Sequence, residues 1–235
     1  MAAHSERMLD ASCRVATQAQ QVLGTPTNVI FSFRNRSPHP ITFSIGNGRS
    51  DSYRFLSSHD VTVLDPYYEF GGISAIRQLE PGQEMIDDVL LNEYLYFSRP
   101  GQYVVSCDLD VDVTDARTGM VQAHSFRGQI DLKLVENPDI KRATIGTLAA
   151  DLDSQDSQRQ LRASGILSEL RDRSVVPIMV RGLHLKNDAV VENLLLGLGR
   201  IDSEEARRAL SDFATWTTSP ELRKLAVQQL ARPSR

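Results

Sequence analysis

The chain has 235 residues, of which 41% are hydrophobic and 24% are charged, and its formal net charge is −4. This composition is typical of a soluble globular protein, and the length allows one large domain or two modest ones. No apolar run approaches the ~18 residues of a membrane-spanning helix, which argues against a membrane protein.

The N-terminal residues lack the apolar stretch of a secretory signal, so we expect a cytoplasmic protein, or a periplasmic or secreted one if a signal was removed.

The distribution of charge along the chain limits the kind of partner. The first 136 residues contain 17 acidic and 11 basic side chains, a net charge of −6. The residues from Asn137 onward contain 13 acidic and 15 basic side chains, a net charge of +2. Neither half is basic enough to predict nucleic acid as a partner.

Alternating hydrophobic residues predict short strands in the first half of the chain. The pattern is clearest in residues 28–36, 41–45 and 103–113, where every second side chain is apolar. Residues 60–64 and 126–135 are expected to add two more strands.

Turn signals separate these strands. Pro81-Gly82 and Pro100-Gly101 each combine a residue that fixes φ with one that permits a positive φ, so both predict turns. The segment from Asp115 to Gly119 predicts a hairpin loop. Several short strands separated by Gly and Pro are typical of an antiparallel β-sandwich.

Part of this region resembles a known family. The motif Leu-x-Pro-Gly at residues 79–82, followed by Pro-Gly-x-Tyr-x-Val at residues 100–105, is similar to the late strands of bacterial immunoglobulin-like domains. The segment Tyr94–Phe97 between the two motifs fits the same pattern. The resemblance implies an immunoglobulin-like antiparallel β-sandwich over residues 1–136, and it carries no catalytic residues.

The two cysteines, Cys13 and Cys107, both fall in predicted strands. Two cysteines alone cannot form a structural zinc site, which takes four ligands. A pair of buried free thiols and a disulfide bridge in an oxidising compartment both remain open.

The hydrophobic period changes to between three and four residues after Pro138, which predicts helices. Residues 138–152 are expected to form a first helix, and residues 175–185 and 203–216 two later ones. Polar residues that can cap a helix precede the expected starts. Three further segments align with one another, with apolar residues at their fourth, fifth and eighth positions, and they begin at Ala163, Val191 and Arg223.

The second half also resembles a known family. The sequence Leu-Gly-Arg-Ile at residues 198–201 and the pattern Leu-Arg-x-x-Ala-x-x-x-Leu at residues 222–230 are similar to HEAT-like repeats of the bilin-lyase type. The resemblance covers residues 145–232 and implies a second domain, residues 137–235, built as an αα-superhelix of about three HEAT-like repeats. It implies binding to other proteins and does not imply lyase activity, because such repeats occur in many scaffolds.

Three acidic residues are candidates for calcium. Asp108, Asp110 and Asp112 resemble the first, third and fifth positions of an EF-hand loop, but Val113 stands where Gly is needed and Gly119 where Glu is needed. An EF-hand is therefore excluded. The three carboxylates could still bind calcium with oxygens from another loop, and the alternative is a strand with a solvated acidic face.

Catalytic motifs are missing from the sequence. The five histidines have no metal-ligand spacing, and no Gly-x-Ser-x-Gly motif accompanies them. We therefore expect no cofactor and no enzymatic activity.

Arginines in the second half are the candidates for binding another protein. Guanidinium groups bind carboxylates in bidentate pairs, so a shared ridge of arginines would bind an acidic partner. The alternative is a solvated exterior balanced by Glu204, Glu205 and Asp212. The candidates are Arg173, Arg181, Arg200, Arg207 and Arg208. Trp216, the only tryptophan, is expected in the core of the last repeat, and the alternative is an exposed residue that anchors a partner.

These observations predict a non-enzymatic protein–protein interaction or scaffold module whose two domains offer separate surfaces. One alternative is an extracytoplasmic structural or envelope protein whose sandwich binds calcium or a glycan. Another is an accessory subunit of an enzyme on another chain. A homo-oligomer is possible, because an exposed sheet edge can pair with a second copy.

Overall fold

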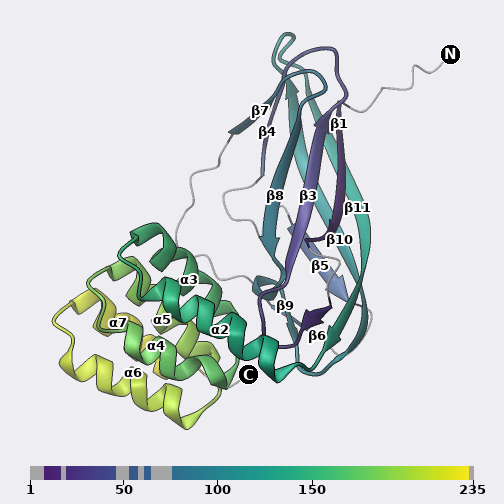
Figure 1. The fold of residues 1–235 in the computed structure, drawn as a ribbon. Helices are drawn as coiled ribbons and strands as arrows, with labels where there is room; N and C mark the ends of the chain where they lie inside the picture. The colour runs from purple at the N-terminus through teal and green to yellow at the C-terminus, as the bar shows by residue number, and fades with distance from the viewer. Residues whose placement is uncertain (1–7, 17–19, 46–52, 58–60, 65–75, 233–235) are drawn as a thin grey trace. The chain divides into compact units, whose positions relative to one another are not determined.

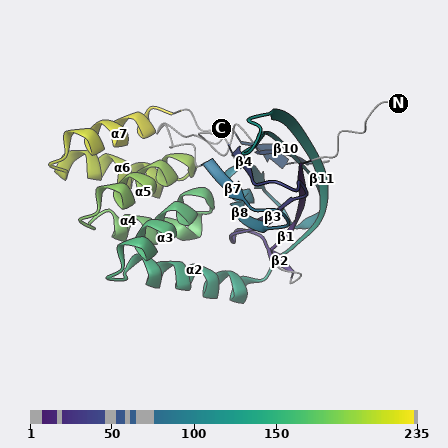
Figure 2. The same ribbon diagram turned by 90° about the horizontal axis from the view of Figure 1, so that it is seen from above.

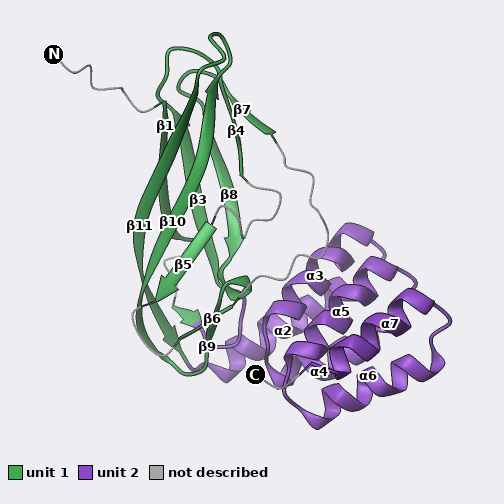
Figure 3. Cartoon of the chain, turned by 180° about the vertical axis from the view of Figure 1, so that it is seen from behind, with its two compact units in different colours: residues 1–21, 27–135 green, residues 22–26, 136–235 purple. Residues whose placement is uncertain are grey.

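A computed structural model describes residues 8–16, 20–45, 53–57, 61–64 and 76–232. The chain divides into two compact units (Figure 3). The strand unit comprises residues 1–21 and 27–135, and the helical unit comprises residues 22–26 and 136–235. The short segment 22–26 thus belongs to the helical unit although it lies near the N-terminus.

The first half of the chain forms strands (Figure 1), as the alternating pattern predicts. A single 3-10 turn, η1 (Leu91–Glu93), lies among the described residues of this half. The strands are β1 (Leu9–Val15), β2 (Gln21–Val22), β3 (Asn28–Asn35), β4 (Ile41–Ser44), β5 (Tyr53–Ser57), β6 (Val61–Val63), β7 (Ile76–Leu79), β8 (Glu84–Leu90), β9 (Leu95–Phe97), β10 (Gly101–Asp115) and β11 (Val121–Val135).

Antiparallel pairing organises most of these strands into two sheets. One sheet has the order β1-β3-β8. In the other, β10 pairs with β11 on one side and with both β5 and β4 on the other, and β7 continues beyond β4. The short strands β6 and β9 pair with each other.

Aromatic side chains of the two sheets meet in a common core. Phe31 of β3 contacts Tyr53 of β5 with ring centroids 4.5 Å apart, and Phe33 of β3 contacts Phe43 of β4 at 5.4 Å. All four rings are buried. Large rings suit this position because stacked sheets lie ~10 Å apart and their inner side chains must span that gap. The prediction of an antiparallel β-sandwich is confirmed.

The turn predictions have mixed outcomes. Gly82 lies in a turn with φ of +75°, and Gly119 closes the hairpin between β10 and β11 with φ of +71°, as expected. The turn predicted at Pro100-Gly101 is wrong, because Gly101 is the first residue of β10. The fixed φ of proline also suits extended backbone entering a strand, and the hydroxyl of Tyr103 donates to the Arg99 carbonyl at 2.7 Å across this corner.

The second half of the chain is helical (Figure 2), as predicted. Central to the unit is α5, which packs against α3, α4, α6 and α7. Of the described residues, no helix is long and apolar enough to cross a membrane. The helices are α2 (Pro138–Leu152), α3 (Ser157–Glu169), α4 (Val176–Gly182), α5 (Asp188–Arg200), α6 (Glu204–Trp216) and α7 (Pro220–Leu230), with a 3-10 turn η2 (Arg173–Val175) before α4.

Side-chain caps begin the helices where the sequence predicts them. The Asn187 side chain accepts from the Val190 N–H at 3.4 Å, and Ser203 Oγ accepts from the Ala206 N–H at 3.1 Å. Ser219 does the same at the start of α7, which has Pro220 in its first turn. Each cap satisfies a backbone donor that has no partner inside the helix.

The segment 22–26 packs on a half-buried ion pair of the helical unit. Lys141 Nζ of α2 lies 2.5 Å from Asp172 Oδ2, which precedes η2. A Cβ atom added to Gly24 would lie 2.7 Å from the same Asp172 oxygen. Burial raises the pKa of Asp172, but hydrogen bonds from Lys141 and Ser174 outweigh it and leave this pKa below its ordinary value.

Candidate interaction surface

Trp216 at the end of α6 is 47% exposed, so its predicted place in the core is wrong. The buried face of α6 is formed by Ala206, Ala209, Leu210 and Phe213. The next buried position along that face is taken by Thr217, directly after the helix. Trp216 therefore lies beside the apolar face, where its ring reaches solvent.

Two neighbouring rings hold the Trp216 indole in place. The His184 ring stacks on it with centroids 4.9 Å apart and planes 12° apart. The buried Phe213 ring meets it edge-on, with centroids 4.7 Å apart and planes 73° apart. We call Trp216 and His184 the aromatic pair. An exposed indole with contacts on two sides has few orientations, and this is the geometry of a preorganised contact residue.

Basic side chains adjoin His184 in the sequence. His184 follows α4 and is exposed, and Arg181 and Lys186 are exposed as well. The segment 181–186 contains no acidic residue. Arg181 forms an ion pair with Asp153 at 2.8 Å, but both side chains are about half exposed, so this pair is weak.

The five candidate arginines all have partners inside the helical unit. Arg208 pairs with Glu204 at 2.8 Å, and Arg173 and Arg207 both contact Asp202. These pairs are exposed, and exposed pairs typically contribute less than ~1 kcal/mol, so a partner's carboxylates can compete for them. The structure does not bring the five side chains together at one point, because Arg200 lies apart in the interior of the unit.

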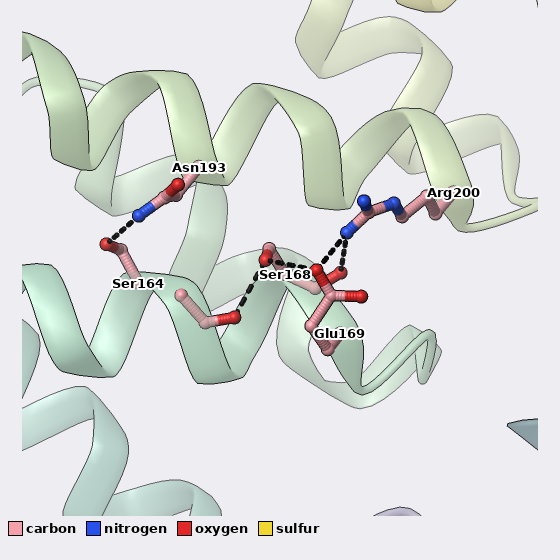
Figure 4. Close-up of polar contacts among 6 residues, drawn as sticks. Ser164, Ser168, Glu169, Asn193 and Arg200 are labelled. Carbon is pink, nitrogen blue, oxygen red and sulfur yellow. Dashed lines mark hydrogen bonds and ion pairs between the residues drawn. The ribbon is translucent and has the colours of Figure 1, made fainter. Parts of the chain in front are cut away.

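Arg200 belongs to a polar seam between α3 and α5 (Figure 4). Its guanidinium forms an ion pair with Glu169 and donates to the Ser168 carbonyl at 3.3 Å. The two charged side chains are only 9% and 15% exposed. Asn193 Nδ2 donates to Ser164 Oγ at 3.0 Å in the same seam. Of the five arginines, Arg200 is therefore the least available to a partner.

The three aspartates proposed for calcium lie on the outer face of β10. Asp110 accepts from Ser125 Oγ at 2.6 Å and pairs with Arg54. The Ser125 hydroxyl, helped by Arg54, lowers the pKa of Asp110. A strand rises ~3.3 Å per residue, so Asp108 and Asp112 start ~13 Å apart, whereas calcium–oxygen bonds are ~2.3–2.6 Å long. The structure thus does not bring the three carboxylates together, and the described part of the chain contains no metal-binding group of three or more such side chains.

Sequence reasoning missed the aromatic pair as a candidate site. A signal was present, because Trp216 is followed by Thr-Thr-Ser-Pro, which ends the helix directly after the ring. The stacking of His184 on Trp216 joins the segment after α4 to the end of α6 and has no signature in the sequence.

Comparisons with known proteins show no family. No family model and no curated protein matches this sequence. Among solved structures, the chain is similar to PapD-like domain 7 of human CEP192, with 13% identity over 55% of this chain and 87% of that one, at a TM-score of 0.30. It is also similar to AggA, the major subunit of aggregative adherence fimbriae type I from Escherichia coli, with 12% identity over 55% and 97% of the two chains, at a TM-score of 0.30.

A third similar structure spans more of this chain. It is Escherichia coli alpha-2-macroglobulin from domain MG7 to the C-terminus, with 8% identity over 95% of this chain and 42% of that one, at a TM-score of 0.31. At TM-scores this low, none of the three similarities carries an argument about function.

Proposed function

We propose that this chain is a non-enzymatic protein-binding module, and that its helical unit binds a partner through the aromatic pair. The observation that carries the proposal is Trp216, which is nearly half exposed and is held by His184 and Phe213. Tryptophan is enriched among the few interface residues that contribute most of the binding energy. A ring that is already oriented loses little conformational freedom when a partner covers it.

The helical unit is proposed to be a stack of HEAT-like repeats. The three aligned sequence segments fall in α3, α5 and α7, with offsets of 28 and 32 residues. Those three helices pack in series, α3 on α5 and α5 on α7. A repeat architecture of this kind presents one surface per layer and commonly binds other proteins. The strand unit is proposed to be an immunoglobulin-like domain with a separate surface.

The proposed partner is a protein with an acidic segment that also carries an apolar side chain. The apolar side chain would cover Trp216, and the acidic residues would approach the basic segment 181–186. Electrostatic complementarity of this kind speeds association and selects the partner, whereas the buried ring supplies most of the affinity.

The experiment compares three full-length proteins in affinity capture followed by binding measurements with purified components. Trp216→Ala removes the proposed contact. Val227→Ala on α7 is the matched control, because Val227 is 53% exposed and lies outside the aromatic pair. We expect the wild type and the control to retain one partner with equal Kd, and Trp216→Ala to weaken binding at least ~30-fold, as truncation of a central contact residue does.

A further variant separates the aromatic pair from the arginines. The double substitution Arg207→Glu and Arg208→Glu reverses the charge of two exposed positions on α6. If this variant loses the partner while Trp216→Ala keeps it, the binding surface is the arginine face and the aromatic pair is not the contact. If no variant or wild-type protein binds any purified candidate, the protein-binding function itself is wrong.

A further inference from the structure

The two cysteines lie on facing sheets of the sandwich with both side chains turned inward. Cys13 is on β1, the edge strand of the sheet β1-β3-β8, and is half-buried. Cys107 is on β10 of the other sheet and is buried, between Val105 and Leu109 on the inner face. Both are free thiols in this structure.

A glycine provides the space in which the two sulfur atoms approach. Gly128 of β11 is directly opposite Cys107 in the antiparallel pair. It occupies an inward position between Phe126 and Ile130, where the alternation would otherwise place a side chain. A Cβ atom at Gly128 would lie 2.5 Å from Cys13 Sγ, so the sulfur occupies the volume of the missing side chain.

This geometry places the thiols within bonding reach. Cβ atoms of directly opposed residues in an antiparallel pair are ~4.5–5.5 Å apart. Cys13 Sγ lies 2.5 Å from the Cβ position of Gly128, the residue directly opposite Cys107, and therefore close to the Cys107 side chain. Disulfides join Cβ atoms that are ~3.5–4.5 Å apart, so the bridge requires the edge strand β1 to bring Cys13 to that separation from Cys107.

We propose that Cys13 and Cys107 are a modification site at which a disulfide forms across the sandwich, with a low-molecular-weight disulfide such as oxidised glutathione as the oxidant. The bond joins β1 to β10 and closes a loop that contains most of the strand unit. This site is independent of the aromatic pair and of the proposed protein-binding function.

The chemistry proceeds in two exchange steps with assigned roles. Cys13 is the attacking residue, because the hydrogen bond from the Cys107 thiol lowers the pKa of Cys13 and its side chain is the more accessible. Its thiolate attacks one sulfur of glutathione disulfide, breaks that S–S bond and releases one glutathione thiol, which leaves glutathione on Cys13.

Cys107 then completes the bridge. The hydrogen bond with Cys13 and burial raise the pKa of Cys107, so it reacts second and only with the adjacent sulfur. It attacks Cys13 Sγ, loses its proton to solvent and displaces the second glutathione. Two protein thiols are oxidised to one disulfide, and one glutathione disulfide is reduced to two thiols.

The test treats the folded full-length protein with oxidised glutathione and counts free thiols, with mass spectrometry of the digested chain. We expect both thiols to disappear together, a peptide pair linked through Cys13 and Cys107, no dimer, and a higher Tm. Cys107→Ser should stop at one glutathione on Cys13, and Cys13→Ser should leave Cys107 unreacted while folded.

Gly128→Ala fills the space that Cys13 Sγ occupies beside Gly128 and removes neither thiol. The added methyl group displaces Cys13 Sγ, so glutathione should persist on Cys13 and the bridge should form at least ~10-fold more slowly, since exchange requires access to the sulfur. Gly146→Ala in α2 is the matched control, because an added Cβ there has no neighbour within 4 Å, and it should react as the wild type does. Stable glutathione on Cys13 of the wild type, a Cys13–Cys13 dimer, or two thiols that react only after denaturation would each overturn the proposal.

Discussion

The two units fill their interiors in opposite ways. In the sandwich, aromatic rings from both sheets bridge the core, as Phe31 with Tyr53 and Phe33 with Phe43 show. In the helical unit, α3 and α5 approach so closely that a Cβ atom at Gly197 would lie 2.7 Å from Ser168 Cα. The distance between layers therefore dictates side-chain size: wide gaps between sheets require large rings, and close helix crossings require glycine and serine.

The units also differ in where their ion pairs lie. The seam between α3 and α5 contains the nearly buried pair Arg200–Glu169, whereas the ion pair Arg54–Asp110 of the sandwich lies on its outer face. A buried pair adds little net stability, but it penalises every packing that separates its members. We infer that the helical seam depends on matched polar partners and the sandwich core on ring volume.

The largest effect should come from removing a ring from the sandwich. Phe33 is fully buried and contacts both Phe31 and Phe43. Phe33→Ala should lower the free energy of unfolding of the strand unit by about 3–5 kcal/mol, because the cavity between the sheets cannot close.

Intrinsic probes separate the two units in this measurement. All six tyrosines precede residue 136, and the single tryptophan lies in α6, so near-UV tyrosine signals report the sandwich and tryptophan fluorescence reports the helices. Leu56→Ala, at a side chain that is 56% exposed, is the control and should change stability by less than ~0.5 kcal/mol. A loss below ~1 kcal/mol for Phe33→Ala would show that ring volume does not support the sandwich.

Strong periodicity made most of the fold predictable. The alternation in residues 103–113 identified the inward face of β10, and all six of its inward side chains are buried. The helix predicted over residues 138–152 is α2 with the same ends, because Asn137 caps it and Pro138 starts it. The segment 22–26 gave no such signal, since five residues carry no period and their place depends on a distant ion pair.

The candidate site was less predictable because it depends on contacts between elements. In the sequence, Arg200 and Arg207 were equally good candidates for binding a partner. In the structure, α3 places Glu169 beside Arg200, and the Arg200 side chain is nearly buried. Trp216 directly precedes Thr217, which takes the next buried position of the α6 face. A shift of one residue along the helix therefore decides whether the ring is buried or exposed. Helix ends and side-chain surroundings of this kind follow from packing, which the local pattern does not determine.

An intermediate effect should come from overpacking the helical seam. Gly197→Ala places a methyl group against the backbone of Ser168, which cannot move aside as a flexible side chain would. The free energy of unfolding of the helical unit should fall by about 1–3 kcal/mol. Gly146→Ala is the matched control, since it adds the same methyl group to an open position of α2 and should stabilise the unit by about 0.5–1 kcal/mol. Equal effects of the two substitutions, measured by tryptophan fluorescence in urea, would show that the seam is not closely packed.

The smallest effect should be a pH-dependent loss of stability when the ion pair Lys141–Asp172, on which the segment 22–26 packs, is removed. The pKa of Asp172 is below its ordinary value in the folded chain, so its ionised form stabilises the helical unit above the unfolded pKa of ~3.9, and that contribution is lost as the pH falls through the folded value. Asp172→Asn should therefore lower the free energy of unfolding by about 1 kcal/mol at pH 7, and the difference from the wild type should shrink as the pH falls below ~4.

Asp110 of the sandwich provides the comparison. Its pKa is also lowered, but its side chain is 48% exposed, so Asp110→Asn should lower the free energy of unfolding by less than ~0.5 kcal/mol at either pH. Urea unfolding at pH 7 and pH 3 checks both variants, and a larger loss at Asp110 than at Asp172 would contradict the inference that charge is structurally more important in the helical unit.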